Sequence, residues 1–126
     1  MSAPRRIQMT RQRPWRADNP DAVIVDRRTK WGNPFQLTSV NTLGAGRLHR
    51  VSHNGSVLET FASRSDAARD AVRRYLRAVE LGWGDAPWPD EIRAELAGRD
   101  LACWCPLDSP CHADILLELA NPKEQP

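Results

Sequence analysis

The chain has 126 residues, of which 40% are hydrophobic and 27% charged, and its formal net charge is +2. A chain of this length can bury roughly two-thirds of its unfolded surface in one core, so we expect a single domain over residues 1–126. No stretch approaches the ~20 consecutive apolar residues of a membrane-spanning helix, and no apolar run follows the first arginines. We therefore expect a cytoplasmic protein without a membrane span or a signal peptide.

The positive charge is unevenly distributed along the sequence. Residues 1–30 are clearly net positive, whereas the remainder of the chain is net negative. A phosphate-bearing partner suits the basic end, although a total of +2 falls short of the strongly basic profile of a dedicated nucleic-acid module.

The first third of the chain predicts two strands and a loop. Ile7 and Met9 alternate with polar residues, which indicates a strand near residues 5–11. Residues 22–25 form a continuous apolar run, typical of a central strand that is buried on both faces. Residues 26–35 then contain Gly-Asn-Pro and three cations, which predicts a loop at the end of that strand. Ligands bind at such loops in open α/β sheets.

The remaining segments predict a hairpin, three helices and one more strand. Residues 38–47 are small and glycine-bearing, so we expect a loop there. Residues 48–53 and 56–61 flank Asn54-Gly55, the strongest short hairpin signal. The spacing of apolar residues and the capping residues predict the following elements in order: a helix from Ser63 or Ser65 to about Leu81, a helix at 89–97, a strand at 101–105, a helix at 111–120, and a fraying tail at 121–126.

These elements predict an α/β fold with one small sheet, a β-hairpin insertion and about three helices. If the strands at 22–25 and 101–105 are parallel neighbours, the loops after them meet at one edge of the sheet. This juxtaposition would bring the cationic loop and the cysteine-rich segment together.

All three cysteines lie close together in sequence, at Cys103, Cys105 and Cys111. An odd number of clustered cysteines argues against a secreted disulfide framework and favours reduced thiols. Cys111 and His112 fall in the first turn of the predicted last helix, where the helix dipole stabilises anions and lowers a thiol pKa. We therefore regard Cys111 as a candidate nucleophile, His112 as its acid or base, and Asp114 as an available carboxylate.

Two other interpretations of the cysteines remain open. Cys103, Cys105, Cys111 and His112 would make a Cys3His zinc set. On an extended strand, however, the first two sulfur atoms lie about 6–7 Å apart, too far to share an ion unless the strand bends. Alternatively, the cysteines are small buried hydrophobes. No metal is predicted, and zinc stays an alternative.

Three segments resemble a known family. The sequence from Arg28 to Phe35 reads RTKWGNPF, residues 101–106 read LACWCP, and residues 111–120 read CHADILLELA. They resemble the domain of unknown function 4326, a family of short proteins from bacteria and their phages. The resemblance implies that the Lys30–Phe35 loop and the Cys111–His112 turn are shared features, and it implies no activity.

The two loops together predict a phosphate-friendly pocket with an aromatic wall. The expected ligand is a nucleotide or another phosphate-bearing molecule, stacked on Trp31 or Trp104 and contacted by the last helix. Transferase or hydrolase chemistry on a nucleoside or nucleotide would fit, although the sequence leaves open whether the protein is an enzyme. The expected ligand-binding residues are Arg28, Lys30, Trp31, Gly32, Asn33 and Cys105.

The alternative function is a non-catalytic accessory module. It would bind nucleic acid or protein through the basic N-terminal stretch and the arginine-rich face of the helix at 64–81, with structural or zinc-bound cysteines. Steep salt dependence would distinguish nucleic-acid binding from a small-ligand pocket. The sequence does not fix the oligomeric state.

Overall fold

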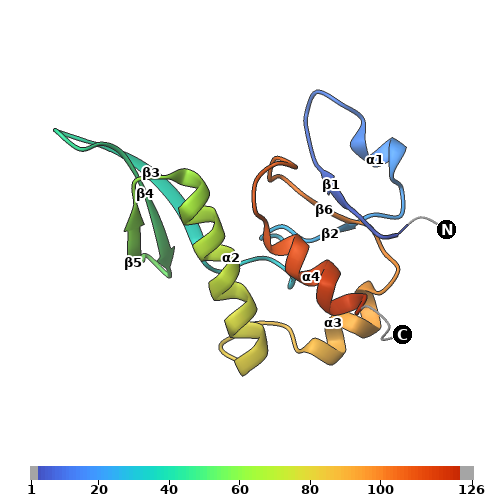
Figure 1. Ribbon diagram of the computed structural model, residues 1–126. Coiled ribbons are helices and arrows are strands. Elements are labelled where there is room, and N and C mark those ends of the chain that lie inside the picture. Colours follow the sequence, from blue (N-terminus) through green and yellow to red (C-terminus); the bar gives the residue numbers. More distant parts are fainter. Residues whose placement is uncertain (1–2, 123–126) are drawn as a thin grey trace.

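The computed structural model describes residues 3–122 and places two three-stranded sheets on either side of a long helix (Figure 1). Both helices and strands are present, which confirms the predicted α/β class. The elements in chain order are β1 (Arg6–Gln8), α1 (Trp15–Asp18), β2 (Val23–Ile24), β3 (Gln36–Thr42), β4 (Gly46–His53), β5 (Ser56–Phe61), α2 (Arg64–Leu81), α3 (Pro89–Leu96), β6 (Leu101–Cys103) and α4 (His112–Ala120).

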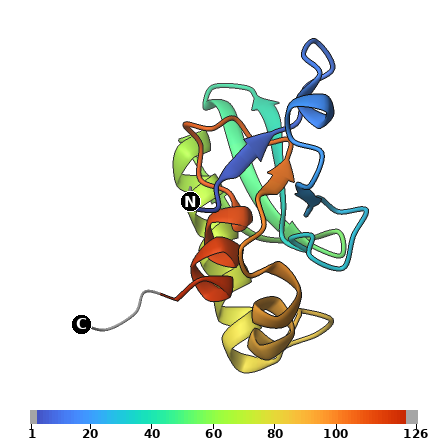
Figure 2. The same cartoon turned by 90° about the vertical axis from the view of Figure 1, so that its right-hand side faces the viewer.

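The first sheet is parallel, with the order β1-β6-β2. β6 is its central strand, and all three of its residues are buried. The prediction that residues 22–25 form the central strand is wrong: β2 is an edge strand, and Val23 and Ile24 are only half-buried. The predicted parallel pairing of these two strands is confirmed, because Val23 pairs with Leu101 in parallel register. Figure 2 shows β1 beside β6 at the front of this sheet.

The second sheet is antiparallel, with the order β3-β4-β5. The hairpin predicted around Asn54-Gly55 is confirmed, and both residues adopt positive φ, at 50° and 83°. The loop predicted at residues 38–47 is wrong for most of its length, because β3 pairs with β4 along seven residues. Gly44 and Gly46, at φ 84° and 73°, close the tight turn between them. These glycines therefore mark a turn between two strands rather than a long loop.

α2 connects the two sheets. One side of this helix packs Ala67, Ala71 and Ala78 against Val51 of the antiparallel sheet. The other side places Tyr75 and Val79 in the larger core, beside α4 and the parallel sheet. This two-sided packing explains why the predicted amphipathic helix contains so few large apolar residues on its antiparallel-sheet side.

The remaining helices follow the predictions with small differences. α3 and α4 confirm the helices predicted at 89–97 and 111–120, and α1 is a single helical turn between β1 and β2. The predicted fraying does not begin at Asn121, because its side chain accepts a hydrogen bond from the Gly98 N–H and donates one to the Leu117 carbonyl. Residues 123–126 of the predicted tail lie outside the described residues. No helix within residues 3–122 is long and apolar enough to cross a membrane.

Candidate functional site

The loops after β2 and β6 meet at one edge of the parallel sheet, as predicted from the sequence. The indole Nε1 of Trp104 donates a hydrogen bond to Asp26 Oδ2 across the two loops, at 3.1 Å. The same carboxylate oxygen accepts a hydrogen bond from Arg28 Nε at 2.9 Å. Asp26 therefore links the loops, and Arg28 balances its charge.

A cavity of about 670 Å³ lies between these two loops and the N-terminal half of α2. Four arginines line it: Arg11, Arg27, Arg28 and Arg64. Arg28 is paired with Asp26. The other three are exposed and form no ion pair or side-chain hydrogen bond with any residue in the described part of the chain. The cavity rim therefore carries positive charge that no carboxylate within residues 3–122 balances.

Arg11 and Arg64 were not predicted as site residues. Arg11 follows β1, and Arg64 is the first residue of α2. Both residues lie outside the two predicted loops in the sequence, so nothing indicated that they would be close to these loops in space. A cue existed only in the order of the elements, since β1 is parallel to β6 and its C-terminal end therefore points toward the same edge.

Lys30 and Trp31 do not line the cavity, although both were expected to bind the ligand. The ammonium of Lys30 instead donates hydrogen bonds to Glu91 and Glu95 of α3, each at 2.8 Å. These hydrogen bonds raise the pKa of Lys30. Trp31 is buried in the larger core, and its carbonyl accepts a hydrogen bond from the Tyr75 hydroxyl at 2.9 Å. Lys30 therefore holds the loop against α3, and Trp31 holds it against the core.

Gly32 and Asn33 shape the same loop. A Cβ atom at Gly32 would lie 2.6 Å from Arg27 Cα and 2.8 Å from the Asp26 carbonyl oxygen, so only glycine fits without a shift of the backbone. Asn33 lines the cavity, and its Nδ2 donates to the Ala71 carbonyl of α2 at 3.1 Å. Of this pair, therefore, Asn33 reaches the cavity, whereas Gly32 permits the loop to fold back on itself.

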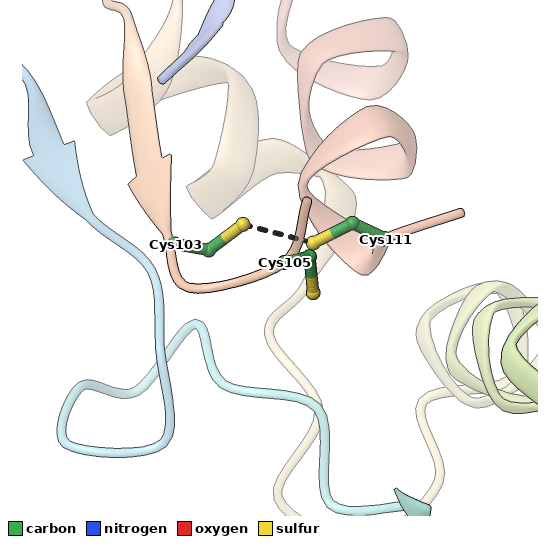
Figure 3. A group of neighbouring side chains, drawn as sticks. All are labelled: Cys103, Cys105 and Cys111. Atoms are coloured by element: carbon green, nitrogen blue, oxygen red, sulfur yellow. Dashed lines mark hydrogen bonds between the residues drawn. The ribbon is translucent and has the colours of Figure 1, made fainter. Parts of the chain in front are cut away.

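Three thiols line the cavity, and Figure 3 shows their side chains close to one another. β6 ends at Cys103, the chain then bends, and the Sγ atoms of Cys103, Cys105 and Cys111 lie within 4.8 Å of one another. The expected separation of 6–7 Å for an extended strand is therefore wrong, because Cys105 lies beyond the end of the strand. Cys103 Sγ and Cys111 Sγ are 3.0 Å apart. Such a group could hold a metal ion.

The surroundings of Cys103 and Cys105 shift their pKa values in opposite directions. Hydrogen bonds from the thiols of Cys103 and Cys111, with a smaller contribution from the positive charge of Arg6, lower the pKa of Cys105. Hydrogen bonds to Cys105 and Cys111, together with burial, raise the pKa of Cys103. Of the three thiols, Cys105 is therefore the one whose surroundings favour the thiolate; it is half-buried, whereas Cys103 and Cys111 are buried.

His112 lies at the cavity wall beside Cys111, as the sequence predicted. Its Nε2 donates a hydrogen bond to the Val25 carbonyl at 2.6 Å, and its Nδ1 is 3.7 Å from Cys111 Sγ. A carbonyl oxygen only accepts, so Nε2 carries a proton and Nδ1 is the ring nitrogen that faces Cys111. Asp114 does not line the cavity; its Oδ2 lies 3.5 Å from Arg6 Nη1. A catalytic role for these residues stays a prediction.

Arg6 is a site residue that the sequence analysis missed. Its side chain is only 8% exposed, and its Nη2 donates to the carbonyls of Pro106 and Leu107, at 3.2 and 2.6 Å. Its Nη1 is buried without a hydrogen-bond partner, and Asp114 is within ion-pair distance but not hydrogen-bonded. Nothing in the sequence indicated that this guanidinium is buried, because arginine on a short strand is usually exposed.

A family model described as "Domain of unknown function (DUF4326)" matches residues 7–122 of the chain. No curated protein and no solved structure matches the chain.

Proposed function

Because the chain belongs to the DUF4326 family, whose description names no activity, we propose a function from the site itself: the cavity binds a nucleotide-like ligand that carries phosphate and a flat ring. The observation that carries this proposal is the set of three unpaired arginines around a cavity of about 670 Å³. That volume falls within the range of small-molecule sites.

The arginines form the phosphate-binding part of the proposed site. Arg11, Arg27 and Arg64 reach the cavity from three different elements. Guanidinium groups bind phosphate oxygens in pairs, and arginine is the cation best suited to this geometry. The N-terminal turn of α4 also borders the cavity through Cys111 and His112, and its positive dipole end favours an anion. These features support an anionic ligand.

Trp104 forms the ring-binding part of the proposed site. Its side chain lines the cavity and is 46% exposed, and the hydrogen bond to Asp26 fixes its orientation. Phe35 and Leu37 add apolar surface to the same cavity. An exposed indole held in place offers a stacking surface for a base. Of the two tryptophans expected to stack, Trp104 is the one that supports this role.

The thiols extend the proposal from binding toward chemistry. Cys105 lines the cavity and its pKa is lowered by its neighbours, so a nucleophile or a metal ligand would lie beside the bound molecule. Transfer or hydrolysis at a nucleoside or nucleotide is the reaction class that this placement favours. Binding by the arginines and Trp104 needs no metal, so it stands apart from any zinc that the thiols would hold.

The test is a titration of the full chain with a nucleoside, its mono-, di- and triphosphates, and inorganic phosphate. We expect saturable binding of one molecule per chain, measured by calorimetry and by tryptophan fluorescence, and tighter binding of the phosphorylated forms. Arg27→Ala and Arg64→Ala should each weaken binding about tenfold or more, because each removes a charged hydrogen bond.

Arg77→Ala is the matched control. It removes one positive charge from the same helix as Arg64, but Arg77 is exposed and does not line this cavity. Its affinity should equal that of the wild type. Equal losses in all three variants would mean that only overall charge matters, and the absence of saturable binding by any compound would overturn the proposal.

A further inference from the structure

The three thiols that line the cavity come from three different local structures. Cys103 ends β6, Cys105 lies in the loop that follows, and Cys111 is the N-cap residue of α4. Their Sγ atoms lie within 4.8 Å of one another. Tetrahedral zinc with bonds of about 2.3 Å holds its sulfur ligands about 3.8 Å apart, so the three thiols need only small shifts to share an ion.

We propose that Cys103, Cys105 and Cys111 bind one Zn²⁺ ion at the wall of the cavity, with its fourth coordination position open toward the cavity. The ion and the three thiolates carry a net charge of −1, since binding releases the remaining thiol protons to solvent. Thiolates favour zinc among the abundant divalent cations, and the three sulfur atoms are close enough to share one ion.

The buried Arg6 is a second and independent observation that points to an anionic centre here. Its Nη2 is bound to the loop that carries Cys105, through the carbonyls of Pro106 and Leu107. Its Nη1 is buried and makes no hydrogen bond, and the nearest carboxylate, that of Asp114, is about half exposed. A buried guanidinium is costly unless it faces a compensating negative charge. A zinc thiolate centre would supply that charge.

His112 is the residue that could close the site, and its contacts hold it aside. The ring is fixed by the hydrogen bond to Val25 and by an edge contact with Tyr75, at 5.2 Å between ring centroids. Its Nδ1 approaches Cys111, but His112 is not part of the group whose ligand atoms all lie within 4.8 Å. Structural zinc sites have four protein ligands, whereas catalytic sites leave one position for water or substrate. The arrangement here is of the second type.

The first experiment measures zinc in the full chain, purified under reducing conditions without chelator and reconstituted with zinc alone. We expect about one zinc per chain by mass spectrometry of the metal, retained in Leu107→Ser and lost in Cys105→Ser. Leu107 is exposed in the same loop, so this control makes a comparable change without removing a thiol. Circular dichroism checks that both variants are folded.

A second measurement needs no variant and therefore does not depend on folding of a mutant. The zinc-loaded wild type should protect its three thiols from an alkylating reagent, and a chelator should expose them. Folded wild type that takes up no zinc would overturn the proposal. So would an intact mass lower by two hydrogens, because it would show that two of the three cysteines form a disulfide instead.

The last experiment tests the open position with cobalt in place of zinc. Azide should change the visible spectrum of the cobalt-loaded wild type, and His112→Gln should leave the spectrum before azide unchanged. Glutamine keeps a donor for the Val25 carbonyl but removes the ring nitrogen Nδ1. If azide has no effect on the wild type and His112→Gln alters its spectrum, His112 is the fourth ligand and the open position is wrong. Neither outcome depends on nucleotide binding.

Discussion

Single residues set the shape of this site through contacts that sequence spacing does not reveal. Lys30 and Arg27 lie three residues apart in one loop, yet Lys30 binds two carboxylates of α3 and Arg27 reaches the cavity. Gly32 allows the loop to turn back tightly onto Arg27. The direction of each side chain therefore depends on which distant element its neighbours contact.

Gly32→Ala should destabilise the protein by about 1–3 kcal/mol, because the added methyl group meets backbone atoms that cannot move independently. Chemical denaturation measures the loss. The same variant should weaken nucleotide binding, since relief of the clash displaces Arg27. Gly84→Ala is a useful comparison, because a Cβ there meets no atom within 4 Å and only its φ of +62° is strained. Wild-type stability in Gly32→Ala would show that the loop is looser than described.

Asp70 should make the stability of the protein depend on pH. Burial disfavours its ionised form, but hydrogen bonds from Arg74 and Arg73 outweigh burial and lower the pKa of Asp70. Because the folded pKa lies below the unfolded value of about 3.9, this contribution is fully present above pH 4 and is lost as the pH falls through the folded pKa. Urea unfolding at pH 7 and pH 3 measures it.

Asp70→Asn is the corresponding variant. It should cost about 1–3 kcal/mol at pH 7, because the two arginines lose a buried charged partner. Its stability should then fall less than that of the wild type between pH 7 and pH 3. An equal fall in both proteins would place the titrating group elsewhere.

At the scale of elements, α2 is the part that joins the two sheets and carries one wall of the cavity. Its first turn places Arg64 at the cavity, and its centre packs on both cores. The sequence left two serines as alternative N-caps. The structure selects Ser63, whose side chain accepts a hydrogen bond from the Asp66 N–H at 3.3 Å.

Ser63→Ala should therefore destabilise the protein by about 1 kcal/mol, the usual cost of losing an N-cap. Ser65→Ala is the matched control, because Ser65 lies inside the helix and is exposed. It should change stability by less than about 0.5 kcal/mol. Thermal or urea unfolding of both variants decides the point, and a larger loss in Ser65→Ala would contradict the assigned start of α2.

The cavity depends on how both sheets pack around α2, because it lies between this helix and the loops next to the sheets. The net charge of +2 is small, and three of the arginines that form no ion pair within residues 3–122, namely Arg11, Arg27 and Arg64, line the cavity. Charge of this kind favours a local anion site over an extended electrostatic surface.

Salt should therefore weaken nucleotide binding only moderately. We expect the affinity to fall by about tenfold or less between 50 and 200 mM salt, whereas a protein with six or more phosphate contacts loses about 10³-fold or more. Calorimetry at four salt concentrations gives the slope. A steep slope with an oligonucleotide, together with weak mononucleotide binding, would favour the nucleic-acid-binding alternative.

Local sequence signals predict most of the elements and the edge of the sheet where the two loops meet. Periodicity, the Asn-Gly turn and helix caps depend on near neighbours, so they predicted the hairpin, α2, α3, α4 and the strand pairing that brings the two loops together. The same local signals misjudged residues 38–47, because glycines near a strand end resemble those of a loop.

Long-range packing selects the side chains that form the site. Arg11 and Arg64 line the cavity from segments far in sequence from the two loops, and Arg6 contacts the loop that carries Cys105, whereas Lys30 and Trp31 contact α3 and the core instead. The close approach of the three thiols likewise follows from the end of β6 at Cys103, which local spacing did not predict. Side chains of irregular segments are directed by long-range contacts, and these exist only once the sheets and helices have packed.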